Sequence, residues 1–299
     1  MPRKPQRPPG DGTREPPELE PLPLIGESPV FKATLERARM LARVRRPVLI
    51  TGATGSGKEA IARFIHMESG VTGAFLALNC ATVPEDIAEA EFFGYQRGAF
   101  TGAQEDHVGL VGQAANGTLF LDEVAELPHA LQLKLLRVLH DGSHRRLGAP
   151  FEQKVSIRII AATNRPLEPL VEKGLFREDL LYRLRMLRLE LPSLRERGDD
   201  AVLIARHFLA EDPDCGPRKL ALSPSACEVL TEYPWPGNVR ELQSALLEAS
   251  LITTADTIEG PHLESVLKWK RQRRDATDSI LDLFPKEGVM STRQLRALT

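Results

Sequence analysis

A short glycine-rich segment limits the possible folds of this chain more than any other part of it. Residues 47–51 read Pro-Val-Leu-Ile-Thr, which is typical of a short buried strand, and residues 58–66 carry apolar positions on one helical face. Between them lies Gly52-Ala-Thr-Gly-Ser-Gly57-Lys58. In a strand–loop–helix context this spacing predicts a phosphate-binding loop, because inward-turned backbone amides and a helix N-terminus favour an anion.

The loop positions have different expected roles. Lys58 is expected to neutralise the β- and γ-phosphates of a nucleotide. The next position is usually Ser or Thr, whose hydroxyl binds magnesium, but here it is Glu59. Because Thr54 and Ser56 stand elsewhere in the loop, we expect water to take the place of that hydroxyl. The predicted nucleotide-binding residues of the loop are Gly52, Ala53, Thr54, Gly55, Ser56, Gly57, Lys58 and Glu59.

A second polar motif ends another apolar strand pattern. Gly117-Thr-Leu-Phe-Leu-Asp122-Glu123 places two carboxylates at the carboxyl end of a strand, where α/β sheets bind ligands. An isolated Asp-Glu pair is usually a solvated turn, but beside a phosphate loop we expect it to be catalytic. Asp122 would hold Mg²⁺, directly or through water, and Glu123 would polarise the attacking water. The two motifs together predict an enzyme that binds and hydrolyses ATP with Mg²⁺.

Strand and helix patterns alternate in the first two thirds of the chain. Strands are predicted over 47–51, 74–78, 118–121, 155–162 and 186–191, and helices over 29–42, 58–66 and 131–139. This alternation predicts an α/β domain over 24–192, with a parallel sheet covered on both faces. The strand at 155–162 runs into Thr163-Asn164, and the Asn164 side chain is expected either to reach the γ-phosphate or only to cap the strand.

The pattern changes after Pro192, where strand signals stop. Helices are predicted over 199–209, from Ser223 to about Tyr233, and over 238–251, which gives a small helical domain over 193–267. Ser223 is the expected N-cap of the middle helix, with Pro224 at its first position. Residues 1–23 contain eight prolines and are predicted to be disordered. The tail, 268–299, opens with five basic residues in seven.

Bulk properties exclude several classes of protein. The formal net charge is −2, so contact with nucleic acid requires a local basic patch. No apolar run reaches the roughly 18 residues of a membrane span. The cysteines Cys80, Cys215 and Cys227 do not have zinc-site spacing. We therefore expect a cytoplasmic protein with reduced thiols and no membrane partner.

A hexapeptide between the two nucleotide motifs gives the sequence a specific resemblance. In Gly98-Ala-Phe-Thr-Gly-Ala103, small residues surround one aromatic, so Phe100 is expected to be an exposed apolar tip that grips a partner. In an isolated sequence, a phenylalanine packed in a tight turn would be the alternative. With the phosphate loop and the acidic strand end, the hexapeptide resembles the AAA+ ATPase domain of bacterial enhancer-binding proteins, which activate sigma-54 RNA polymerase. The similarity runs from about Leu24 to Ile252.

The resemblance implies a fold, a mechanism and partners. The fold is an AAA+ P-loop NTPase, with a parallel sheet flanked by helices and a small helical lid. Subunits form a ring, hexameric in the family, with ATP between neighbours. Hydrolysis moves the hexapeptide loop, which contacts sigma-54 and remodels the closed promoter complex. The residues that the resemblance assigns to this contact are Gly98, Ala99, Phe100, Thr101, Gly102 and Ala103.

Further roles carry over residue by residue. Asn79 matches the residue that restrains the catalytic glutamate, and Asn164 matches the sensor on the fourth strand. Arg177 and Arg183 match arginines that reach the neighbouring subunit's nucleotide, although their residue type alone indicates only surface arginines on a helix. The resemblance thus adds these four side chains to the predicted catalytic set.

Two further matches and two departures complete the resemblance. Arg240 matches the lid sensor, and Ile25–Gly26 resembles the stretch that packs near adenine. Many relatives have Glu where this chain has Gln96, and Arg where it has Leu110. That charged pair can couple the loop to the nucleotide site, so the departures put this route of coupling in doubt.

Alternative functions remain open from the sequence. One is a nucleotide-switched binding module without activator function, and another is an AAA+ remodeller of a different substrate. Residues 278–284 and 291–298 are predicted as the first two helices of a helix-turn-helix, so enhancer DNA is an expected partner only if that unit is complete. The basic residues 268–274 are predicted either to touch phosphates or to form a solvated linker.

Overall fold

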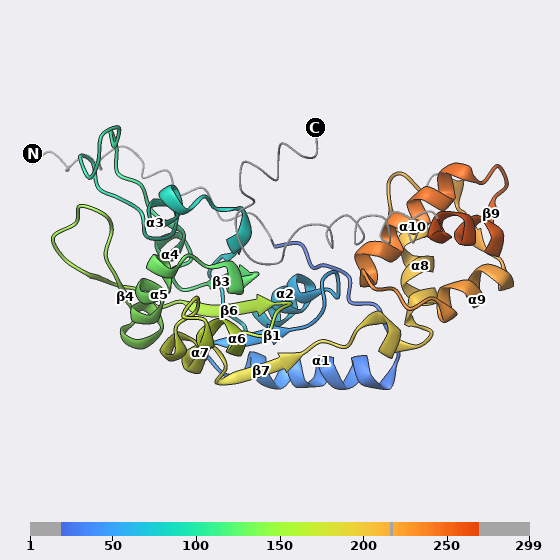
Figure 1. Cartoon of the computed structure of the whole chain (residues 1–299), viewed down its shortest axis with the longest axis horizontal. Helices are drawn as coiled ribbons and strands as arrows, with labels where there is room; N and C mark the ends of the chain where they lie inside the picture. Colours follow the sequence, from blue (N-terminus) through green and yellow to red (C-terminus); the bar gives the residue numbers. More distant parts are fainter. Residues whose placement is uncertain (1–18, 216–217, 269–299) are drawn as a thin grey trace, which may run out of the picture. The chain divides into compact units, whose positions relative to one another are not determined.

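The computed structural model describes residues 19–215 and 218–268 (Figure 1). The predictions for residues 1–18 and 269–299, including both helices of the expected DNA-binding unit, lie outside the described residues. The described chain forms two compact units. The first contains residues 19–24, 32–53 and 57–191, and the second contains 25–31, 54–56 and the described residues from 192 onward. The short stretches 25–31 and 54–56 therefore pack with the second unit, although they lie within the range predicted for the α/β domain.

The first unit is built on a five-stranded sheet with the strand order β2-β3-β6-β1-β7. All four strand pairs are parallel. All six residues of β6 and the first four of β3 are buried, as expected for central strands covered on both faces. This architecture confirms the predicted fold class. The strands are β1 (Val48–Thr51), β2 (Phe75–Asn79), β3 (Thr118–Asp122), β6 (Arg158–Thr163) and β7 (Leu187–Glu190).

Alternate strand residues point to two separate hydrophobic cores. In β1, Val48 and Ile50 pack on one face of the sheet, with α1 (Pro29–Ala42) and α2 (Lys58–Glu68). Leu49 points to the other face, where the core is completed by five helices. These helices are α3 (Glu85–Phe93), α4 (Leu110–Gln113), α5 (His129–Asp141), α6 (Glu168–Glu172) and α7 (Glu178–Leu184). The carboxyl ends of the central strands are thus held between two cores.

The structure differs from the predicted elements at one strand and adds several short elements. The strand predicted over 155–162 begins only at Arg158. Its first residues belong to a hairpin instead, in which β5 (Gln153–Lys154) pairs with β4 (Ser143–His144) and Val155 N donates to Gly142 O at 2.7 Å. Helices α3, α4 and α6 were not predicted, and neither were the short helical turns η1 (Cys80–Thr82), η2 (Val124–Glu126) and η3 (Leu194–Arg197).

The second unit is mainly helical, with α8 (Asp200–Glu211), α9 (Pro224–Glu232) and α10 (Asn238–Ile252) around a core that includes the buried Trp235. The predicted cap of α9 is confirmed, because Ser223 Oγ accepts a hydrogen bond from Ala226 N at 3.1 Å. A parallel pair of two-residue strands, β8 (Ala221–Leu222) and β9 (Thr257–Ile258), was not predicted. Within the described ranges, none of the helices has the length and apolar character needed to cross a bilayer.

Candidate nucleotide site and hexapeptide loop

The phosphate loop passes from β1 to α2 through two glycines in left-handed conformations. The φ angle is +73° at Gly55 and +96° at Gly57. A Cβ atom on Gly55 would lie 2.4 Å from the Gly237 carbonyl oxygen, whereas open space surrounds the corresponding position on Gly57. Only glycine adopts such φ angles readily, so the backbone course explains why the pattern has glycine at these positions.

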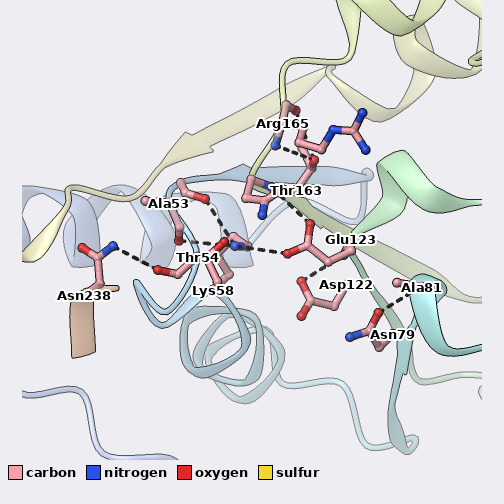
Figure 2. Close-up of polar contacts among 12 residues, drawn as sticks. Ala53, Thr54, Lys58, Asn79, Ala81, Asp122, Glu123, Thr163, Arg165 and Asn238 are labelled. Carbon is pink, nitrogen blue, oxygen red and sulfur yellow. Dashed lines mark hydrogen bonds and ion pairs between the residues drawn. The ribbon is translucent and has the colours of Figure 1, made fainter. Parts of the chain in front are cut away.

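Lys58 is the first residue of α2, and its side chain is almost completely buried. Its Nζ donates to Gly52 O at 3.2 Å and Ala53 O at 3.4 Å, and lies 3.9 Å from Glu123 Oε1 (Figure 2). Beside it, the Ser56 hydroxyl is buried and has no hydrogen-bond partner within the described ranges. A buried cation and an unsatisfied hydroxyl at a helix N-terminus fit a phosphate group.

The acidic pair stands where β3 ends. Asp122 Oδ1 accepts a hydrogen bond from Glu123 N at 3.0 Å. Glu123 itself is left-handed, with φ 50° and ψ 50°, a conformation that is uncommon outside glycine and costs about 1–2 kcal/mol. The turn brings Glu123 Oε2 within 3.4 Å of Asn164 N, just after the end of β6. The glutamate therefore lies between the phosphate-loop lysine and the end of the neighbouring strand.

Asn79 is the last residue of β2, and Asn164 follows the last residue of β6; these two strands flank β3. Asn79 pairs in register with Asp122, but its Oδ1 accepts from Ala81 N at 2.9 Å and caps η1. The Glu123 carboxylate contacts Lys58 and Asn164, and no hydrogen bond joins it to Asn79 in the described structure. The expected restraint of Glu123 by Asn79 therefore stays a prediction.

The residues suit a magnesium ion that is shared with the substrate. The described part of the chain holds no group of three or more His, Cys, Asp or Glu residues placed to form a metal cage. Mg²⁺ commonly uses one or two carboxylates together with phosphates and waters, and Asp122 fits that need. Glu59 does not replace the missing hydroxyl, because its Oε1 bonds Arg63 Nη2 at 2.7 Å and Nε at 3.0 Å, one helical turn away.

The acidic pair also affects a buried thiol that the sequence analysis left without a role. Cys80 follows β2 in η1 and is 2% exposed. Burial, followed by the charges of Asp122 and Glu123, raises the pKa of this thiol to about 12. The thiol therefore stays protonated at neutral pH, chiefly because it is buried.

The two predicted neighbour-reaching arginines lie at opposite ends of α7. Arg177 immediately precedes the helix, and its Nε and Nη2 bond the Asp179 carboxylate at 3.0 and 2.8 Å. Arg183 lies in the last turn and has no ion pair in the described structure. Neither arginine has a hydrogen bond or ion pair with the phosphate loop or the acidic pair of its own chain, within the described residues. The structure therefore does not bring them into the site of a single subunit.

Gln132 positions Arg177 and was not predicted as a functional residue. Its side chain is completely buried in α5. The amide nitrogen donates to Leu127 O at 2.9 Å and Leu175 O at 3.0 Å, and the amide oxygen accepts from Arg177 N at 2.8 Å. The sequence did contain one sign of this role: Gln132 is a polar residue on the otherwise apolar buried face of the predicted helix.

In the second unit, Asn238 fixes the start of α10. This residue is buried with φ 52°. Its Nδ2 donates to Thr54 O at 3.0 Å (Figure 2), and its Oδ1 accepts from Leu194 N at 2.8 Å. The next residue, Val239, donates its N–H to Gly55 O at 3.0 Å. Arg240, the predicted lid sensor, follows and is exposed.

The Ile25–Gly26 stretch is held by a buried ion pair within the same unit. Asp200 Oδ2 accepts from Arg197 Nε at 3.0 Å, and both side chains are at most 4% exposed. Asp200 also accepts from Glu27 N at 2.7 Å, while Arg197 donates to Ile25 O. Burial alone would raise the pKa of the Asp200 carboxyl, but its hydrogen bonds hold that pKa below the ordinary value. The role of Arg197 and Asp200 could not be predicted from the sequence, because the backbone groups that they hold lie more than 170 positions away in the chain.

The hexapeptide forms a loop closed by its own backbone. Gly98 N donates to Ala103 O at 2.9 Å, and Ala103 N donates to Phe100 O at 3.0 Å. Phe100 is 46% exposed, with its ring edge against Tyr95 at a centroid distance of 5.0 Å, while Ala103 is buried. The aromatic tip is thus accessible, although Tyr95 covers one side of it.

The two departures from the family lie at the base of this loop. Gln96 N donates to Leu147 O at 2.9 Å in the β4–β5 hairpin, and Leu147 N donates to Gly94 O at 2.9 Å. Leu110 begins α4 and packs against the hydrophobic core. The structure thus gives this position an apolar packing role.

Comparisons with known proteins agree with the order of these elements. Residues 24–190 match the family described as the sigma-54 interaction domain, and residues 195–280 match the AAA+ ATPase lid domain. The chain belongs to the sigma-54 interaction domain family.

Several proteins that the chain resembles are transcriptional regulators. The chain is 45% identical over 242 residues to the alginate biosynthesis transcriptional regulatory protein AlgB of Pseudomonas aeruginosa, covering 80% of this chain and 54% of AlgB. It is 44% identical to the response regulator protein PilR of the same species, covering 82% of this chain and 56% of PilR. The chain therefore spans about half the length of these curated relatives.

A solved structure gives the same fold with nucleotide. The structure of NtrX from Brucella abortus in complex with ATP has a TM-score of 0.73 and 31% sequence identity, covering 93% of this chain and 59% of that chain. In this member of the sigma-54 interaction domain family, four of the predicted residues lie together where α2 begins and where β3 and β6 end. They are Lys58, Asp122, Glu123 and Asn164.

Proposed function

We propose that this protein is an ATPase that activates transcription by remodelling sigma-54 RNA polymerase. The observation that carries the proposal is the combination, on one α/β unit, of the Lys58–Glu123 strand-end site with an accessible Gly98–Ala103 loop. Membership of the sigma-54 interaction domain family supports the partner. The ATP complex of the NtrX relative supports the nucleotide.

The proposed chemistry follows from the geometry of the strand ends. Lys58 binds the phosphates, since in the described part of the chain its buried ammonium has two carbonyl partners and a carboxylate 3.9 Å away. Glu123 accepts the proton of the attacking water, and Asn164 N holds one of its oxygens. Asp122 would hold a magnesium ion, which would supply charge neutralisation on the phosphates. Catalysis here is chiefly positioning and electrostatics, so a fixed glutamate is the main requirement.

We propose that a neighbouring copy of the chain completes this site. Arg177 and Arg183 have no contact with their own phosphate loop in the described structure. In the proposed ring, they stabilise the developing charge on a neighbour's γ-phosphate, as an arginine finger does. The Asp179 carboxylate holds Arg177 and raises its pKa by hydrogen bonding, so this side chain is charged and pre-oriented at α7.

In the proposed function, ATP hydrolysis changes the position of Phe100 in the hexapeptide loop. The loop is attached to the rest of the unit mainly by backbone hydrogen bonds at its base. Gly98 and Gly102 have positive φ and open space around their Cβ positions, which allows the loop to change course. The exposed Phe100 ring supplies apolar area for contact with sigma-54.

Binding to purified sigma-54 tests this function. The full chain is mixed with sigma-54 in ADP plus aluminium fluoride, in ADP, or without nucleotide, and the complex is measured by size-exclusion chromatography. We expect a complex only with the aluminium fluoride mixture. The Leu251→Ala variant, which removes an apolar side chain that is 77% exposed in α10, controls for nonspecific apolar contact and is expected to bind normally. Equal binding in all three nucleotide conditions, or none, contradicts the proposal.

A second candidate function is a nucleotide-switched binding module that does not activate transcription. The apolar packing of Leu110 and the uncharged Gln96 favour it, because the charged pair of many relatives is absent. Turnover separates the candidates. If the wild type hydrolyses ATP no faster than Glu123→Gln at high protein concentration, the binding module becomes the better explanation.

A further inference from the structure

Gln132 lies between the segment that follows Glu123 and the segment that carries Arg177. It belongs to the first turn of α5, which packs beside α7 in the first unit (Figure 1). The short helical turn η2 begins directly after Glu123, and Leu127 caps its end. Arg177 directly precedes α7. The strand-end site and the predicted neighbour-reaching arginine therefore meet at one buried side chain.

Every polar group of the Gln132 side-chain amide is used. The amide has two N–H donors and one carbonyl acceptor. The donors bond Leu127 O at 2.9 Å and Leu175 O at 3.0 Å, and the acceptor receives Arg177 N at 2.8 Å. The reverse orientation would place the amide oxygen against two carbonyl oxygens, so the backbone partners determine the orientation. The amide thus joins backbone groups from two separate segments.

The core position that Gln132 occupies does not by itself require a polar residue. The other buried residues of α5 are Leu131, Leu135 and Val138, and an unbranched apolar side chain would fill a similar volume. Such a residue would leave one N–H and two carbonyl groups without their partners inside the protein, which is costly. Gln132 is therefore best explained by the backbone groups that it holds.

Arg177 is held at its backbone and at its side chain. Gln132 holds its N–H, and its carbonyl oxygen accepts from Leu181 N at 3.1 Å as α7 begins. Asp179 holds its guanidinium. Because the guanidinium lies at the end of a long side chain, a small rotation of the backbone moves it further than the backbone itself moves. A misplacement of about 1 Å is sufficient to slow an enzymatic reaction about 100-fold.

We propose that Gln132 is a positioning residue for ATP hydrolysis in the neighbouring subunit. It sets the course of the backbone at Arg177, and through Leu127 it ties that course to the segment after Glu123 of its own subunit. The inference rests on the proposed function, in which Arg177 reaches a neighbour's γ-phosphate. In the described structure no hydrogen bond joins Gln132 to its own phosphate loop, so its effect on hydrolysis passes through Arg177.

The Gln132→Met variant tests this role in steady-state kinetics. It keeps the length of the side chain and removes all three amide hydrogen bonds. At high protein concentration, we expect kcat to fall about tenfold or more and KM for ATP to stay within about twofold of wild type, because the phosphate loop is unchanged. Gln132→Asn keeps the amide on a shorter side chain and should lose less activity; it replaces the methionine variant if that variant does not fold.

Val138→Ala is the matched control for a loss of stability. It removes buried methyl groups from the same helix, so urea denaturation should show lower stability for both Val138→Ala and Gln132→Met. The two variants should differ in turnover, because Val138 does not hold the backbone at Arg177. We expect Val138→Ala to retain the kcat of wild type.

Mixed subunits show which site Gln132 serves. Gln132→Met and Glu123→Gln are combined at equal concentrations before ATP is added. Glu123→Gln subunits then present a correctly placed Arg177 to neighbours whose own Glu123 is intact. We expect turnover about threefold or more above the sum of the two variants measured alone. Gln132→Met mixed with Arg177→Ala should show no such gain, because both variants present a defective arginine.

The opposite pattern overturns the inference. A gain with Arg177→Ala but not with Glu123→Gln would show that Gln132 acts on the site of its own subunit. No gain in either mixture, an unchanged kcat in Gln132→Met, or an equal loss in Val138→Ala would leave Gln132 with a structural role only.

A third mixture separates this inference from the proposed function. Arg177→Ala combined with Glu123→Gln should gain turnover if a neighbour completes the site, whatever Gln132 does. A gain there, without one for Gln132→Met and Glu123→Gln, overturns only the role of Gln132. No gain in the third mixture contradicts completion of the site by a neighbour, and the inference with it.

Discussion

The strand-end site and the hexapeptide loop are held in different ways. Lys58 and Glu123 stand at the ends of buried elements, and their side chains contact each other and neighbouring backbone. The hexapeptide is held by backbone hydrogen bonds near its base, and its Phe100 side chain is 46% exposed. The strand-end site is fixed by two hydrophobic cores, whereas the hexapeptide depends on a few backbone hydrogen bonds.

This difference indicates a division of labour within one unit. Phosphoryl transfer requires groups whose positions do not change from turnover to turnover. A segment that transmits motion has to open its contacts at low cost, so it comes from the less stable part of a structure. Substitutions in the two regions should therefore separate catalysis and stability from partner binding.

The largest expected effect concerns the charge at the end of β3. Glu123→Gln keeps the shape of the side chain but removes the base, so ATP turnover should fall about 100-fold or more. Phosphate release at saturating ATP measures it. Glu126→Gln is the control, since this nearby glutamate pairs with Arg165 at the surface and should retain near-normal turnover. If Glu123→Gln lowers ATP turnover only slightly, or if both variants lower it equally, the catalytic role proposed for Glu123 is wrong.

The glycines of the two regions provide the next comparison. Gly55→Ala places a Cβ 2.4 Å from a backbone oxygen, so we expect a loss of about 3 kcal/mol or more in the free energy of unfolding. Gly98→Ala, with φ +83° and open space, should cost only about 1 kcal/mol. Urea denaturation measures both values, and ATP affinity should fall only in Gly55→Ala. Equal costs would show that the loop is as tightly packed as the phosphate-binding region.

The buried thiol of Cys80 gives a test of how firmly η1 is held beside the strand ends. With a pKa of about 12, Cys80 is about one part in 10⁴ thiolate at pH 8, and it is also buried. Alkylation of the native protein should therefore be at least about 100-fold slower at Cys80 than at the partly exposed Cys227. Mass spectrometry of iodoacetamide-treated protein measures the two rates. Comparable rates would indicate that the η1 segment opens readily.

The smallest expected effect is a pH dependence of stability. Burial, followed by the charge of Arg158, lowers the pKa of His66, whose Nδ1 is hydrogen-bonded to Thr118 Oγ1 at 2.8 Å. Below pH 6.5, the ordinary pKa of histidine, the unfolded chain therefore binds more protons at His66 than the folded chain does. The stability that neutral His66 contributes is complete above pH 6.5 and is lost as the pH falls below it. It is worth at most about 1.4 kcal/mol per pKa unit.

Denaturation of the wild type and of His66→Gln between pH 7.5 and pH 5 checks this sign. We expect the wild type to lose stability toward acid pH more steeply than the variant. A wild type that becomes more stable in acid would contradict the assigned direction. His144, near the loop, has the same direction of shift and adds to the wild-type slope that remains in His66→Gln.

The elements that could be predicted from the sequence are those set by local patterns. The phosphate loop and the β3 end combine short-range apolar runs with polar residues at fixed spacing, and both form where expected. The N-cap of α9 follows from Ser223 and Pro224 alone. Local backbone preferences and side-chain patterns are sufficient in these places.

The parts that were missed depend on contacts between distant residues. Asp200 accepts a hydrogen bond from Glu27 N, 173 positions away, and Gln132 joins Arg177 across 45 positions. In the sequence, Asp200 belongs to a charged stretch typical of a surface helix. The β4–β5 hairpin was hidden because its two-residue strands are too short to show a period.

The central claim is that the strand ends supply the chemistry while Phe100 supplies the contact with sigma-54. Phe100→Ala tests it most directly when ATP turnover and sigma-54 binding in ADP plus aluminium fluoride are measured on the same preparation. We predict turnover within about twofold of wild type and sigma-54 binding weakened about tenfold or more, as expected for the loss of an aromatic anchor. Unchanged sigma-54 binding in Phe100→Ala, or turnover lost together with binding, would contradict the account.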